Sequence, residues 1–300
     1  MPELPEVETV LRGLRDRVVG LRIADVKVLN VAVITGAAED FRRTIAGRSI
    51  AALRRKGKVL AVELRSVDGE APRYLVVRLG MTGQVILSPR EAAVAPHTHL
   101  RLGLEGGELE LRFRDARRFG RLRSSTAGEL ETLFDRLGPD AREVSLQHLE
   151  ETLKGRRGAI KGWLLNQQML SGLGNIYSDE ALFEARIHPR TPAGCLRPDA
   201  VIRLHKAIRK VLSRAVNLQG TSFRDYIDIE GRPGRYSARL KAYGRAGESC
   251  RRCGSRIRRI VVCGRGSHFC PNCQRPPRSP APPGRPRKRL KRNTKVRKRA

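Results

Sequence analysis

The hydrophobic periodicity of the chain changes once, near residues 137–140. Before this point, short segments with alternating apolar residues recur between turn-forming glycines, as in half-buried β-strands. After it, apolar residues recur with the spacing of amphipathic helices. The sequence Leu137-Gly138-Pro139-Asp140 at the junction interrupts both patterns. The chain therefore predicts a β-rich unit followed by a helical unit.

Within the β-rich unit, eight segments have the alternating pattern of strands. They cover residues 23–34, 49–55, 58–64, 74–79, 85–87, 100–104, 109–113 and 119–123. A helix is predicted before them, because Val7, Val10, Leu11 and Leu14 recur at helical spacing after Pro5. In the helical unit, helices are predicted near 145–153, 158–169, 176–185 and 198–218. The strand spacing favours a sandwich or a barrel.

Four cysteines near the end of the chain have the spacing of a zinc site. Cys250 and Cys253 form one CxxC pair, Cys270 and Cys273 form another, and sixteen residues separate the pairs. Two such pairs let two tight turns present four thiolates tetrahedrally to one Zn²⁺ ion. A hairpin this short cannot bury a core, so metal binding is expected to supply much of its folding free energy. Accidental spacing of structural cysteines is the alternative.

These features predict an α+β multidomain chain with four units. They are an N-terminal β-rich domain with flanking helices (1–135), a helical domain (136–235), a β-hairpin zinc module (236–275) and a tail (276–300). The tail contains six prolines and eleven basic residues with almost no apolar side chains. Such a composition is typical of disorder.

The charge of the chain indicates its partner. The 61 Lys and Arg residues against 30 Asp and Glu residues give a formal net charge of +31, and the part before the tail still carries an excess of cations. A polyanion is the expected partner. No apolar run approaches the roughly 20 residues that span a bilayer, and the N-terminus lacks the pattern of a secretory signal. We expect no membrane partner and a reducing compartment, where cysteines favour metal over disulfides.

The second and third residues could act as a reagent. Removal of Met1 would leave Pro2 as an N-terminal secondary amine. α-Amino groups titrate about 2.5 units below lysine, so more of such an amine is neutral and able to attack an aldehydic carbon, forming an iminium. Glu3 beside it can move protons. The alternative is that Glu3, Glu6 and Glu8 only complement the dipole of the first helix.

Several segments together resemble the formamidopyrimidine-DNA glycosylase family, the bacterial MutM-type enzymes that remove oxidised purines. The similarity begins with PELPEVETV at 2–10 and continues, in order, through 54–58, 79–83, 115–120, 159–161, 174–177, 220–225, 243–245 and the four cysteines. It covers essentially residues 2–274 and leaves the tail outside. The resemblance implies a β-sandwich with flanking helices for residues 1–135, a helix–two-turn–helix fold for the helical DNA-binding domain, and a β-hairpin zinc finger for 236–275.

The resemblance also implies a chemistry for four residues. Pro2 matches the proline that attacks C1′ of the damaged nucleotide, and Glu3 matches the proton donor. Lys58 matches the lysine associated with β-elimination, although the residues alone suggest an ordinary hairpin lysine. Arg265 matches the zinc-finger arginine linked to δ-elimination and phosphate contact, where a cation stabilises developing negative charge.

Further matches concern DNA binding. A damaged base must leave the stack before it can be reached, which costs a few kcal/mol. Met81, Arg117 and Phe119 match the side chains that fill the vacated space. Contacts to the DNA backbone are implied for His97, Arg156, Lys161 and Asn175. Residues 172–175 would present free backbone amides to a phosphate.

The sequence departs from the family pattern at four positions. Arg78 stands in place of a common histidine, Ala116 in place of a proline, and Phe223 in place of a leucine. Arg235 replaces an aromatic residue in the loop that covers the flipped base in the family. The loop change bears on lesion preference more than on reaction type.

We therefore expect a monomeric bifunctional DNA glycosylase and abasic-site lyase of base excision repair. It would act on damaged double-stranded DNA containing 8-oxoguanine or formamidopyrimidines and cut the strand by β,δ-elimination. An endonuclease VIII-like enzyme for oxidised pyrimidines and a catalytically silent zinc-containing DNA-binding protein are the alternatives. The expected location is the cytoplasm or nucleoid, or the nucleus if the source is eukaryotic. The tail is expected to contact nucleic acid.

Overall fold

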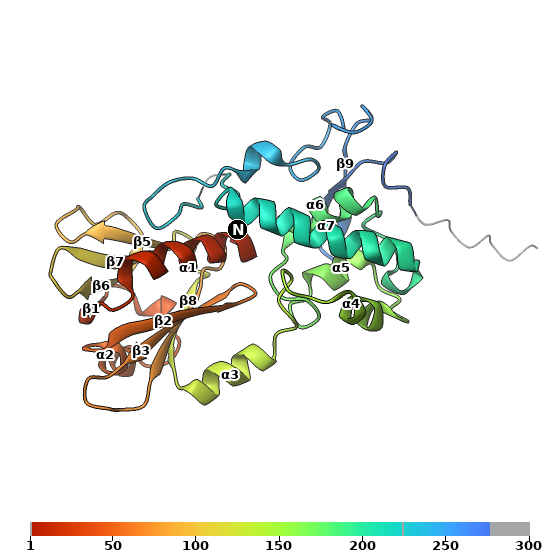
Figure 1. The fold of residues 1–300 in the computed structure, drawn as a ribbon. Helices are drawn as coiled ribbons and strands as arrows, with labels where there is room; N and C mark the ends of the chain where they lie inside the picture. Colours follow the sequence, from red (N-terminus) through yellow and green to blue (C-terminus); the bar gives the residue numbers. More distant parts are fainter. Residues whose placement is uncertain (1, 224, 277–300) are drawn as a thin grey trace, which may run out of the picture.

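The protein consists of a β-rich lobe and a helical lobe, with the N-terminus between them (Figure 1). The computed structural model describes residues 2–223 and 225–276. The expected tail lies outside the described residues except for Pro276. None of the helices within the described ranges has the length and apolar character needed to cross a membrane.

Two four-stranded antiparallel sheets form the β-rich lobe, as the sequence predicts. The first has the order β2-β3-β4-β8 and the second the order β1-β6-β7-β5. The strands are β1 (Ile23–Val28), β2 (Ser49–Lys56), β3 (Val59–Arg65), β4 (Arg73–Arg78), β5 (Gln84–Pro89), β6 (Thr98–Leu104), β7 (Leu109–Arg114) and β8 (Arg121–Ser125). Helix α1 (Leu4–Val18) packs its apolar stripe into the core between the sheets.

The β-rich lobe differs from the sequence prediction in one strand and two helices. The first strand ends at Val28 instead of residue 34, because the Asn30 side chain accepts the N–H of Ala32 and starts a short 3₁₀ turn. Helices α2 (Ala38–Ile45) and α3 (Ala127–Asp135) are absent from the sequence prediction. Helix α3 begins with a capping box between Thr126 and Glu129, and this pattern can be recognised in the sequence.

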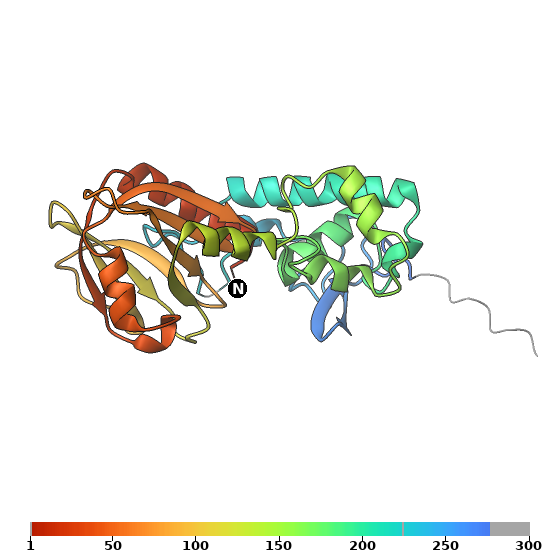
Figure 2. The same cartoon turned by 90° about the horizontal axis from the view of Figure 1, so that it is seen from below.

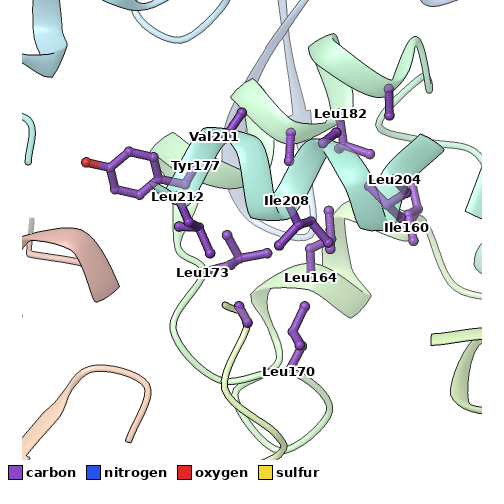
Figure 3. Packing of buried hydrophobic residues seen from close by; sticks show 14 of the residues in the cluster. Ile160, Leu164, Leu170, Leu173, Tyr177, Leu182, Leu204, Ile208, Val211 and Leu212 are labelled. Carbon is purple, nitrogen blue, oxygen red and sulfur yellow. The ribbon is translucent and has the colours of Figure 1, made fainter. Parts of the chain in front are cut away.

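The helical lobe is built around one apolar cluster (Figure 3). Its helices are α4 (Leu146–Leu153), α5 (Ile160–Leu165), α6 (Asn175–Ala185) and α7 (Pro198–Asn217). Three of the four match the expected ranges closely. The exception is α5, predicted to reach residue 169. It ends early because the Asn166 side chain accepts the N–H of Gln168 and turns the chain.

Each lobe contributes side chains to the apolar core of the other lobe. Leu4, at the start of α1, packs in the helical cluster, whereas Tyr226 and Ile229 pack in the cluster of the sandwich. The Leu87 N–H also donates to the Ile229 carbonyl at 2.8 Å. Chain segments therefore cross between the lobes in both directions.

A β-hairpin made of β9 (Arg258–Val262) and β10 (Arg265–Phe269) extends from the helical lobe (Figure 2). Its base packs on Phe183 of α6 through Ile257 and the cysteines. Asp179 of α6 also accepts the backbone N–H of His268 at 2.8 Å. The hairpin is thus attached to α6 at two points, by apolar packing at Phe183 and by a hydrogen bond at Asp179.

Buried charges connect the lobes near the β2–β3 turn. The Arg55 guanidinium donates to Glu8 of α1 and to Asp140, and all three side chains are largely buried. Asp140 also accepts the N–H of Gly57 at 3.1 Å. Because Gly57 precedes Lys58, this carboxylate fixes the turn that carries the lysine.

We predict that Asp140→Ala lowers the free energy of unfolding by about 3 to 5 kcal/mol, because it leaves the buried Arg55 with one carboxylate partner. Glu131→Ala is the matched control. It removes the partner of the neighbouring Arg54 from an exposed ion pair, and should cost about 1 kcal/mol or less. Urea denaturation measures both changes, and equal losses would contradict this role of Asp140.

Candidate active site

The carboxylate of Glu3 lies at the N-terminus of α6. It accepts the backbone N–H groups of Gly174 at 2.6 Å, Ile176 at 2.8 Å and Tyr177 at 3.3 Å. The first N–H groups of a helix lack partners within the helix and attract anions. Glu3 therefore joins the start of the chain to the helical lobe, and its side chain is fully buried.

A second buried carboxylate, Glu6, extends this connection. It accepts the Glu3 N–H at 2.7 Å, the Thr221 N–H at 2.7 Å and the Tyr177 hydroxyl at 2.5 Å. Figure 3 shows the Tyr177 hydroxyl pointing away from the apolar cluster that holds its ring. The first turn of α1 is thus tied to the helical lobe through both carboxylates.

Burial makes both carboxylates weaker acids than usual. It raises the pKa of Glu3, although the charge of Lys58 and the three N–H groups oppose the rise. Burial also raises the pKa of Glu6, and the neighbouring Glu3 adds to the effect. A carboxyl with a raised pKa holds a proton to higher pH and can donate it.

Lys58 faces these carboxylates from the start of β3. Burial lowers the pKa of its ammonium, with a further lowering from Arg265, while Glu3 and Glu6 oppose the shift. A lowered pKa increases the neutral fraction that can accept a proton. Lys58, Glu3 and Arg265 line one cavity of about 450 Å³ together with Met81 and Asn175.

This cavity brings together five of the predicted site residues from segments far apart in the chain. Pro2 adjoins the cavity through its peptide bond to Glu3 and is buried. Met1 lies outside the described residues. Phe223, Tyr243 and Cys263 also line the cavity. Of these three, Phe223 was noticed in the sequence only as a departure from the family pattern.

Two loops hold Met81, Arg117 and Phe119 beside each other. Met81 is partly buried, whereas Phe119 is 53% exposed and the Arg117 guanidinium lies 5.1 Å from the centre of its ring. The buried Asp115 accepts the N–H of Arg117 at 3.2 Å. Gly80 has a φ of +63°, and a Cβ there would lie 2.6 Å from the backbone of Phe119. The loops can therefore approach this closely only with glycine at 80.

The residues predicted to contact the DNA backbone have different surroundings. His97 and Arg156 are exposed, and neither is among the described residues that line the cavity. Asn175 donates to the Gly266 carbonyl of the zinc hairpin at 3.0 Å. The expected contacts of His97 and Arg156 with the DNA backbone therefore stay predictions.

Lys161 lies in a buried environment. Its side chain is fully buried and forms an ion pair with Asp179, which also accepts a hydrogen bond from the His268 backbone. The ammonium is engaged with Asp179, and its expected contact with the DNA backbone stays a prediction. The physical reason for the pairing is that Asp179 would otherwise be an unpaired buried charge. Sequence reasoning missed Asp179, because its partners come from α5 and from the distant hairpin.

The four cysteines fit one zinc ion. Their sulfur atoms all lie within 4.8 Å of one another, with 3.5 Å between Cys253 and Cys270 and 4.0 Å between Cys250 and Cys273. A tetrahedron of sulfurs about 2.3 Å from zinc has edges of about 3.8 Å. The donor set and its size therefore match a structural zinc site.

Comparisons with known proteins agree with this geometry along the chain. The formamidopyrimidine-DNA glycosylase N-terminal domain matches residues 1–122, and the H2TH domain of the same enzymes matches residues 137–226. The zinc finger found in FPG and IleRS matches residues 247–276. The three matches follow the sandwich, the helical lobe and the zinc hairpin in order.

Individual relatives cover nearly the whole chain. Formamidopyrimidine-DNA glycosylase from Chloroflexus aurantiacus is 43% identical over 277 residues, which are 91% of this chain and 98% of the relative. A Lactococcus lactis FPG variant bound to Fapy-dG-containing DNA has a TM-score of 0.85 at 34% identity, over 92% of this chain and 100% of that one. MutM bound to DNA containing carbocyclic 8-oxo-G has a TM-score of 0.84 with the same identity and coverage.

A β-sandwich, an H2TH lobe and a four-cysteine zinc finger together define a zinc-containing DNA glycosylase of DNA repair. The chain belongs to the formamidopyrimidine-DNA glycosylase family.

Proposed function

We propose that this protein excises oxidised purines from double-stranded DNA through an imine with Pro2 and then cuts the strand at the resulting site. The observation that carries the proposal is the shared cavity of Glu3, Lys58, Met81, Asn175 and Arg265. It combines a buried carboxyl, a lysine with lowered pKa and an exposed cation beside the N-terminal residue.

Base removal begins at the amine of Pro2 after Met1 is cleaved off. The nitrogen lone pair attacks C1′ of the damaged nucleotide, and the bond between C1′ and the base breaks. Glu3 supplies a proton that leaves with the base or goes to the opening sugar. The raised pKa of Glu3 favours this role, because the group retains its proton at higher pH than an exposed glutamate.

Strand cleavage follows from the iminium. The iminium acidifies the proton on C2′, and loss of this proton expels the 3′ phosphate in β-elimination. Lys58 is positioned as the proton acceptor, since burial favours its neutral form. Arg265 stabilises the negative charge of the departing phosphate, including the second phosphate lost in δ-elimination.

The loop residues Met81, Arg117 and Phe119 fill the space that the flipped base leaves. An exposed aromatic ring stacked with a guanidinium suits this task, because both are planar and can contact neighbouring bases. The excess of cations favours DNA binding. Damaged duplex DNA bound by a monomer is therefore the proposed complex, and repair in the cytoplasm or nucleoid is its proposed setting.

Borohydride trapping on a duplex with an abasic site or 8-oxoguanine tests the mechanism. Reduction of the iminium should join protein and DNA covalently. Pro2→Gly should lose most of this adduct while retaining duplex binding, because it removes the secondary amine and leaves the binding surface intact. Gel electrophoresis of trapped complexes and an equilibrium binding assay measure the two effects.

The matched control is Lys58→Gln, which removes the other candidate amine. It should still form the adduct and should cleave the strand more slowly. Full trapping by Pro2→Gly together with loss of trapping by Lys58→Gln would assign the nucleophile to Lys58. Absence of any adduct with correctly processed protein would support the catalytically silent alternative.

Lesion preference is the second prediction of the proposal. Two of the similar structures bind DNA that contains Fapy-dG or carbocyclic 8-oxo-G, and another, of Lactococcus lactis FPG, binds DNA that contains an oxidised pyrimidine. We expect faster single-turnover excision of 8-oxoguanine than of thymine glycol from otherwise identical duplexes. Much faster release of thymine glycol would favour the oxidised-pyrimidine enzyme.

A further inference from the structure

A second cavity of about 450 Å³ lies in the helical lobe. It is bounded by α6, by α7 and by the segment from Tyr236 to Arg251, which passes beside these helices in Figure 1. None of its lining residues lines the cavity at Glu3 and Lys58. Its volume is within the range of small-molecule sites.

Cations dominate the walls of this cavity. Lys210, Arg214, Arg239, Lys241 and Arg251 face two carboxylates, Glu180 and Glu184. Both carboxylates are already engaged. Glu184 binds the two lysines, and Glu180 accepts the backbone N–H groups of residues 241–243.

Two of the cations have no such partner. Within the described part of the chain, neither the Arg214 nor the Arg239 side chain forms a hydrogen bond or an ion pair with another residue, and both are exposed. Guanidinium groups present a planar fork of donors that matches phosphate oxygens. Their position at one cavity therefore indicates an anionic ligand.

A largely buried tyrosine gives an independent indication. The Tyr236 side chain is only 4% exposed, and its ring packs against Tyr177 at 5.7 Å between centroids. Tyr236 lines the cavity, and its hydroxyl has no hydrogen-bond partner among the residues that the structure describes. The hydroxyl keeps some accessible surface although the rest of the side chain is buried, so it can donate to a ligand in the cavity.

We propose that this cavity binds a small anion with at least two phosphate groups, independently of the DNA cleft. The cations around a single concavity suit clustered negative charge on one compact ligand. A DNA backbone instead spaces its charges along an extended surface. Arg214 and Arg239 would bind phosphate oxygens, and the Tyr236 hydroxyl would donate to the same ligand.

Titration calorimetry with inorganic pyrophosphate and the zinc-loaded full-length protein tests the proposal. We expect one site per chain. Arg214→Gln/Arg239→Gln should weaken binding by at least about tenfold, since each charged hydrogen bond contributes about that factor or more. Tyr236→Phe should also weaken it while keeping the packing of the ring.

Lys206→Gln/Arg209→Gln is the matched control, because it removes the same charge from exposed positions of α7 that do not line the cavity. Its affinity should stay within about twofold of the unsubstituted protein, as the loss is only of screened, long-range attraction. Equal weakening by both double variants would overturn the proposal by showing a general charge effect. Unchanged affinity in Arg214→Gln/Arg239→Gln, or no binding at all, would also overturn it.

Discussion

The hydrogen bonds from the N-terminus of α6 to the buried Glu3 carboxylate determine how the active site is assembled. They attach the first residues of the chain to the helical lobe and place Pro2 between the lobes. The same burial that makes this docking specific raises the pKa of Glu3. One side chain thus connects the arrangement of the lobes with the chemistry proposed between them.

The zinc hairpin depends on the same helix. Asp179, one turn beyond the residues that bind Glu3, holds Lys161 and the backbone of His268. Asn175 holds the carbonyl of Gly266 next to Arg265. Helix α6 therefore positions the carboxylate, the hairpin and its arginine relative to one another.

The sequence predicts the elements and the metal site more fully than the buried polar contacts. The repeat of apolar residues and the CxxC pairs each lie within a short stretch of sequence. The strands of the β-rich lobe, the main helices and the zinc ligands can therefore be predicted from them. The role of Glu3 at another helix and the burial of Lys161 depend on partners distant in the chain. Resemblance to a family identified these positions, but only the structure shows their surroundings.

The most direct test of the account compares base release and strand cleavage in Glu3→Gln under single-turnover conditions. A glutamine keeps one oxygen that can accept backbone N–H groups at α6, loses the second, and cannot donate the carboxyl proton. Base release from an 8-oxoguanine duplex should slow by about a hundredfold or more, the contribution of a general acid. Cleavage of a preformed abasic site should be affected far less. Base release at the unsubstituted rate would contradict the proposed role of Glu3.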